Sequence, residues 1–163
     1  MPRLPVILIS CALAAAAVAS GCGEEGAAEG ARVTVYVSAP MHGPEGAAGE
    51  GLCVEAREQA AQGKGDSELK LRVICLDASE EGGDWSLAQV GANARRATED
   101  STAIAYVGEP EAEARRQSGP ILEAAEIAQL GRIGGRQAIA QVQAALDEGD
   151  ASDPRAAVFD AVE

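Results

Sequence analysis

The sequence predicts an α/β fold in which a parallel sheet of three to four strands is flanked by helices. Short segments rich in Val, Ile and Tyr alternate with longer segments whose apolar residues recur at helical spacing, in the order β-α-β-α-β-α. The third strand candidate, residues 102–108 (TAIAYVG), is almost wholly apolar, as is typical of a central strand buried on both faces. Such sheets have right-handed crossovers, and ligands bind at the carboxyl ends of their strands.

Local composition and helix- or strand-ending residues define the individual elements. The first strand, RVTVYVSA, lies between Gly30 and Pro40, and the second, LKLRVICLD, alternates apolar residues with Lys70 and Arg72, as at a sheet edge. The predicted strands are residues 32–39, 69–77, 102–108 and, as a remnant fourth strand, 127–130. The predicted helices are residues 47–62, a segment from the N-cap Asp84 to about 99, 111–125 with an interruption near Gly119-Pro120, 136–148, and a short helix that starts at Asp153-Pro154.

The first residues have the pattern of a secretory signal peptide. Arg3 supplies a positive charge, and residues 4–19 form a nearly unbroken apolar run that is too short for a comfortable membrane-spanning helix. Two cleavage sites compete at the end of this run. Cleavage after Ala17-Val18-Ala19 would release a secreted protein, whereas Ala19-Ser20-Gly21-Cys22 resembles a bacterial lipobox, in which Cys22 receives the lipid. We expect lipidation at Cys22.

The chain is therefore expected to have four parts. Residues 23–30, GEEGAAEG, are polar and rich in glycine, which suits a flexible tether between a membrane anchor and a folded domain. The predicted parts are a signal peptide (1–21), a tether (22–31), an α/β lobe (32–130) and carboxyl-terminal helices (131–163). The expected location is the outer face of the bacterial cell membrane, or the periplasm or medium if no lipid is attached.

Composition restricts the classes of partner. The formal net charge is −13, so phosphate backbones would repel the chain and a nucleic-acid partner is disfavoured. Aromatic residues make up 2% of the sequence, so the core must be thin and built from Val, Ile, Leu and Ala.

The sequence contains no combination of residues that indicates catalysis, a metal or a cofactor. The glycine-rich segment 43–49 lacks the spacing of a phosphate-binding loop, and His42 is the single histidine, without a partner cluster. Glu109, Glu111 and Glu113 follow the third strand, where we expect solvated carboxylates rather than general acids. We therefore predict that the protein is not an enzyme.

Two cysteines remain once Cys11 is removed with the signal peptide and Cys22 is lipidated. Cys53 lies on the helix that joins the first two strands, and Cys75 lies on the core face of the second strand. A helix packs over the strands that it joins, and export makes a disulfide chemically permissible. Two interpretations are open: a Cys53–Cys75 disulfide, or two buried thiols that act as small apolar groups.

Residues 33–127 resemble the amino-terminal lobe of the solute-binding lipoproteins of branched-chain amino acid ABC transporters, which have the type I periplasmic-binding fold. The resemblance is carried by the first strand running into VYVSAPMHGP, the second strand ending in LD, the segment SLAQVGANARRATEDSTAIAYVG and the run SGPILEAAEIAQL. The final segment, DPRAAVFDAV, resembles the last helix of that family. Members of the family have two lobes that close on a ligand; here the second lobe is absent, so the resemblance implies a truncated or degenerate form.

The ligand-binding positions of the family are less well matched than its scaffold. The resemblance places Ala112 where the family has a hydroxyl residue, residues 131–134 (GRIG) where it has a Ser/Thr-rich loop, and Glu126 where it has a glycine. If a solute binds, the resemblance implies Ser38, His42, Gly43 and Ser118 as the nearest candidate ligand-binding residues.

The sequence supports two hypotheses from different classes. The first is an exported, lipid-anchored, solute-binding-like protein of an ABC transport system, with an amino-acid-like small solute and an ABC permease as partners. The second is a cell-envelope interaction module that pairs through its exposed cleft face, with another lobe or with itself.

Overall fold

A computed structural model describes residues 32–63, 68–80, 83, 85–109, 111–131, 133–150 and 152–162. The predicted signal peptide, Cys22 and the tether lie outside the described residues. Within the described residues, no helix combines the length and the apolar character needed to cross a bilayer.

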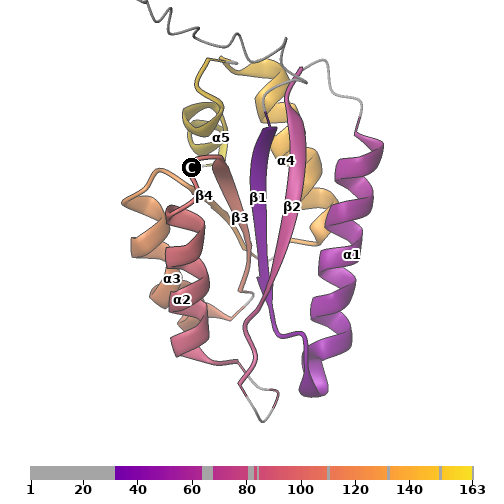
Figure 1. Ribbon diagram of the computed structural model, residues 1–163, viewed down its shortest axis with the longest axis vertical. Helices are drawn as coiled ribbons and strands as arrows, with labels where there is room; N and C mark the ends of the chain where they lie inside the picture. The colour runs from indigo at the N-terminus through magenta and orange to yellow at the C-terminus, as the bar shows by residue number, and fades with distance from the viewer. Residues whose placement is uncertain are drawn as a thin grey trace, which may run out of the picture.

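Four parallel strands form one sheet in the order β2-β1-β3-β4 (Figure 1). The strands are β1 (Arg32–Ala39), β2 (Lys70–Asp77), β3 (Ala103–Gly108) and β4 (Ala128–Leu130). All six residues of β3 are buried, as expected for a central strand. The predicted α/β class and parallel sheet are confirmed, and β4 is the short fourth strand.

Helices cover both faces of the sheet, as Figure 1 shows with α1 on one side and α2 and α3 on the other. The helices are α1 (Gly46–Gln62), α2 (Leu87–Thr98), α3 (Ala112–Glu123), α4 (Gly135–Glu148) and α5 (Pro154–Val162), with a 3₁₀ turn, η1 (Gly43–Glu45), before α1. The helices α1, α4 and α5 enclose one core, in which Val35, Val107 and Ile139 are fully buried. The smaller core under α2 and α3 contains Tyr106, Leu122 and Ile127.

Two predicted helix features were wrong. The N-cap of α2 is Ser86, whose hydroxyl accepts a hydrogen bond from the Gln89 N–H, and the predicted cap Asp84 lies outside the described residues. The predicted interruption of α3 is absent, because Pro120 stands inside a continuous helix. Pro120 and Arg116, whose carbonyl loses its helical partner to the proline ring, are both exposed, so water can solvate that carbonyl.

A disulfide joins α1 to the edge strand β2 on the larger core. Cys53 is buried on α1, and its Cα atom lies 6.0 Å from that of Cys75 on β2. Of the two interpretations of Cys53 and Cys75, a disulfide or two buried thiols, the structure contains the disulfide. The bond holds α1 against a strand that has a neighbour, β1, on one side only.

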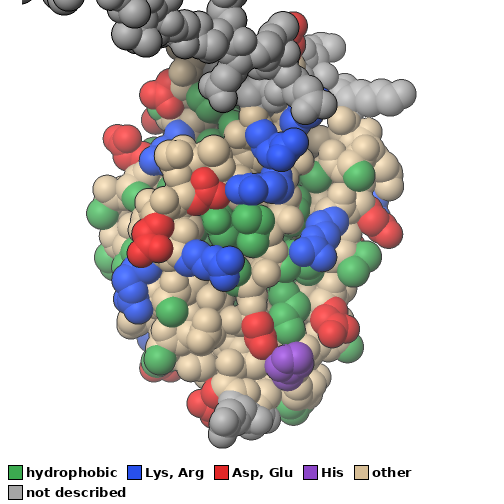
Figure 2. All heavy atoms as spheres, in the orientation of Figure 1, with side chains coloured by type: hydrophobic (Ala, Val, Ile, Leu, Met, Phe, Trp, Pro, Cys, Tyr) green, Lys and Arg blue, Asp and Glu red, His purple; other side chains and the backbone are tan. Residues whose placement is uncertain are grey.

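The opposite face of β1 and β2 is basic. Figure 2 shows Lys and Arg side chains around an apolar patch over these two strands. Lys70 and Arg72 are exposed, and Arg72 donates to the Thr34 hydroxyl and forms an ion pair with Asp100 at 3.1 Å. The prediction that the alternation of Lys70 and Arg72 with apolar residues marks a sheet edge is confirmed, because β2 is an edge strand on which both side chains are exposed.

Candidate functional site

The carboxyl ends of β1 and β3 meet where the chain changes direction across the sheet. The chain passes from β1 to the edge strand β2 over one face of the sheet and returns to β3 over the other. The helices that follow the neighbouring strands β1 and β3 therefore lie on opposite faces of the sheet. A crevice opens at such a switch point in α/β sheets, and ligands bind there.

A hollow of about 270 Å³ lies at this switch point, between the ends of β1 and β3 and the start of α1. Its wall is mostly apolar and includes backbone brought close by glycines. The lining residues are Ala39, Pro40, Glu45, Ala48, Gly49, Leu52, Trp85, Gly108 and Ile133. Gly108 has no side chain, which leaves this space open. The backbones of β1 and β3 are so close here that a Cβ atom at Gly108 would lie 2.2 Å from the Ser38 carbonyl oxygen.

Trp85 and Glu45 form a polar contact in this wall. The indole Nε1–H of Trp85 donates to Oε2 of Glu45 at 2.9 Å. Glu45 ends the turn η1 and is the N-cap of α1, and Trp85 pairs with Ser79 across an isolated β-bridge. The contact therefore joins the loops that follow β1 and β2.

Asp77 at the end of β2 fixes the loop that follows β1. One carboxylate oxygen accepts from the N–H groups of Met41 and Ser79, at 2.9 and 2.8 Å, and the other lies 3.3 Å from His42 Nε2. Partial burial alone would raise the pKa of Asp77, but the hydrogen bonds from Ser79 and Met41 and the nearby His42 together lower it below its ordinary value. The His42 side chain is 74% exposed, so its ion pair is solvated.

Gly43 follows His42 at a point where two loops touch. Its φ of +73° lies in the left-handed region, and a Cβ atom there would be 2.5 Å from the Cα atom of Gly83. Gly43 therefore serves a close contact between the β1 and β2 loops. A larger residue at this position would separate them.

Glu109 is fully buried, and the expectation that it would be a solvated loop carboxylate was wrong. Its φ of +61° turns the chain directly after β3, so that the side chain returns beneath α3. The Tyr106 hydroxyl donates to Oε1 at 2.8 Å, and Oε2 accepts from the Ser118 hydroxyl and from Gln129 Nε2, the latter at 3.2 Å. The carboxyl group thus links β3, α3 and β4.

Burial has the largest effect on the pKa values of Glu109 and Tyr106. Loss of solvation raises the pKa of Glu109, although the hydrogen bonds from Ser118 and Tyr106 and the positive charge of Arg115 oppose the rise. Burial and the Glu109 carboxylate both raise the pKa of Tyr106. The Arg115 guanidinium donates to the Glu109 backbone carbonyl at 2.8 Å. This hydrogen bond stabilises the turn in which Glu109 has a positive φ.

The four candidate ligand-binding residues occupy three different places. Ser38 is buried and accepts from Asn93 Nδ2 at 3.0 Å, and Ser118 is buried against Glu109. His42 and Gly43 lie on the rim. None of the four is among the residues that line the hollow. The lining residues Trp85 and Glu45 were missed as site residues, although the single tryptophan of the chain follows the predicted strand 69–77, whose carboxyl end lies at the ligand-binding edge of the sheet.

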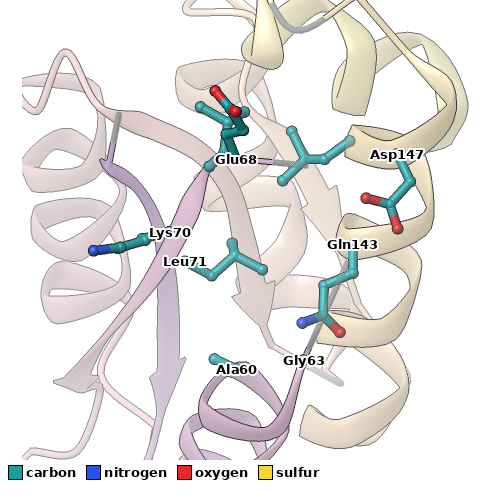
Figure 3. A pocket seen from close by; sticks show the side chains of 9 residues that line it. Ala60, Gly63, Glu68, Lys70, Leu71, Gln143 and Asp147 are labelled. Carbon is teal, nitrogen blue, oxygen red and sulfur yellow. The ribbon is translucent and has the colours of Figure 1, made fainter. Parts of the chain in front are cut away.

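A second hollow, of about 430 Å³, lies at the opposite end of the sheet, between α1, α4 and the start of β2. Figure 3 shows Leu71 and Gln143 directed into it, while Lys70 points away. This hollow is larger, but it lies at the amino end of β2, whereas ligands of parallel sheets bind at the carboxyl ends. The hollow beside Trp85 is therefore the stronger candidate site.

The described residues contain no cluster of three or more His, Cys, Asp or Glu side chains that could hold a metal ion. No protein-family model matches the chain, and no curated protein matches its sequence. Among solved structures, the chain is similar to a possible leucine/isoleucine/valine-binding protein from Rhodopirellula baltica SH 1. The TM-score is 0.49 at 20% sequence identity, and the match covers 61% of this chain and 26% of the other. The matched region thus spans about a quarter of that protein.

Proposed function

We propose that this protein is exported, is anchored to the outer face of the membrane through lipid on Cys22, and holds a small solute by an apolar group in the hollow beside Trp85. The observation that carries the binding proposal is the position of an apolar hollow at the switch point between β1 and β3. Amino-acid-like solutes, an ABC permease and self-association remain predictions from the sequence.

Binding at this hollow alone is expected to be weak. A branched group of five carbons would gain about 4 kcal/mol from burial, at roughly 0.8 kcal/mol per carbon. A free energy of about 4 kcal/mol alone corresponds to a dissociation constant of about 1 mM, and loss of translational and rotational freedom opposes this gain, so dissociation constants weaker than about 1 mM are expected. A free amino acid must also give up water around two charged groups, each of which needs a partner.

Titration of the mature protein with 3-methylbutan-1-ol should change the emission of Trp85 saturably, because this is the single tryptophan and it lines the hollow. Ala48→Phe should abolish the change by filling the hollow, and the adjacent exposed Ala47→Phe should not, because Ala47 is not a lining residue. An unsaturable response in the unsubstituted protein, or an equal response in Ala48→Phe, would contradict the binding proposal.

Leucine, isoleucine and valine should not bind with dissociation constants near micromolar or tighter. Calorimetry on the mature protein measures this affinity, and a value near micromolar would restore the interpretation of the protein as a transport receptor.

The anchor is tested separately. The protein expressed in a bacterial host should incorporate radiolabelled fatty acid and partition into detergent, and Cys22→Ser should lose both properties. If the unsubstituted protein never incorporates the label, the proposed lipid anchor is wrong. The solute-binding proposal does not depend on this result.

A further inference from the structure

We propose that the hollow selects an apolar organic cation, such as an amine with a branched alkyl group, through Glu45 and Trp85. This inference rests on the proposed function, because it names the class of solute that the same hollow would hold.

The charge of the hollow points to a cation. Among the described residues that line it, Glu45 alone carries a charge, and the others present apolar side chains or backbone. A carboxylate can accept about four hydrogen bonds, and Trp85 supplies one to Oε2. Glu45 can therefore also accept from an ammonium group at the mouth of the hollow.

Among the described residues, further carboxylates follow the carboxyl end of β3, which borders the hollow. Glu111, the N-cap of α3, and Glu113, in the first turn of α3, are both exposed. In the part of the chain that the structure describes, the His42 side chain lies against the Asp77 carboxylate and the Arg115 guanidinium donates to the Glu109 carbonyl. A solute carboxylate placed beside Glu45 would meet repulsion, whereas an ammonium group would be attracted.

Trp85 favours the same class of solute. The indole ring attracts cations, tryptophan being the strongest aromatic side chain in this respect. Its Nε1–H is held on Glu45, so the ring and the carboxylate are next to one another in one wall. An ion pair to the exposed Glu45 and a cation–π contact are each modest, and together they should favour the amine over the neutral alcohol by about tenfold.

The test compares three probes that carry the same branched alkyl group at pH 7 and low salt: 3-methylbutan-1-amine, 3-methylbutan-1-ol and 4-methylpentanoate. Trp85 emission reports binding. We expect the amine to bind about tenfold more tightly than the alcohol and the carboxylate to bind most weakly. Added salt should reduce the preference for the amine, because it screens exposed charges.

Glu45→Gln removes the charge but keeps an oxygen that can accept from Trp85, so the ratio of the amine affinity to the alcohol affinity should fall to about one in this variant. Glu50→Gln is the matched control, because Glu50 is an exposed carboxylate on α1 that does not line the hollow. Equal affinities for amine and alcohol, tighter binding of the carboxylate, or an unchanged preference in Glu45→Gln would overturn the proposed selectivity while the hollow still binds solute. If no probe binds, the proposed function fails with it.

Discussion

Reduction of the Cys53–Cys75 disulfide is expected to lower the free energy of unfolding by about 3 kcal/mol. The bond closes a loop with a sequence separation of 22 residues, and a closed loop of this length removes about that much conformational freedom from the unfolded chain. Small domains are stable by only about 5–15 kcal/mol, so the loss is a large share of the total. The effect matters here because the core contains few aromatic side chains.

Urea unfolding of the mature protein with and without reductant measures this difference. The double variant Cys53→Ser/Cys75→Ser is the control, and its stability should match that of the reduced protein and should not respond to reductant. Mass spectrometry after alkylation gives an independent check. Two alkylatable thiols in protein isolated from the envelope would show that the bond is absent in the exported protein.

The order of the elements could be predicted from the sequence, because strands buried on one or both faces have distinct patterns. The apolar residues of β3 identified it as central, and the alternation of Lys70 and Arg72 with apolar residues identified β2 as an edge. The ends of the helices were harder to predict. Ser86 and Asp84 are both good N-caps in sequence, and the observed hydrogen bond to Gln89 decides between them.

The candidate site could be placed at the correct edge of the sheet but not composed residue by residue. The position of Glu109 depends on a backbone turn with φ of +61°, which local sequence patterns rarely predict for a residue other than glycine. Its burial also requires Ser118 and Gln129, which come from elements 9 and 20 residues further along the chain. Likewise, the pairing of Trp85 with Glu45 spans 40 residues and depends on how two loops meet.

Glu109→Ala is expected to destabilise the protein by about 3–5 kcal/mol, because the donors left behind are buried and each unsatisfied group costs about 1–3 kcal/mol. Those donors are the Tyr106 and Ser118 hydroxyls, whereas the part-buried Gln129 amide keeps its hydrogen bond to the Ser118 hydroxyl. Urea unfolding measures the change. The exposed carboxylate Glu111 is a matched control two residues away, and Glu111→Ala should change stability by less than about 0.5 kcal/mol.

Because Glu109→Ala can abolish folding, Glu109→Gln and pH provide a second measurement. Burial raises the pKa of Glu109 in the folded protein, so the folded state binds this proton more tightly than the unfolded state. The resulting contribution to stability is complete below the unfolded pKa of about 4.3 and is lost as pH rises through the folded pKa.

Glu109→Gln cannot titrate, so the unsubstituted protein should lose stability relative to this variant as pH rises through that window. Asp77 and Asp100 have lowered pKa values, which favour stability at higher pH, but they are present in both proteins and cancel in the difference. A stability difference that stays constant from pH 4 to 9, or that grows in favour of the unsubstituted protein, would show that the pKa of Glu109 is not raised in the folded protein.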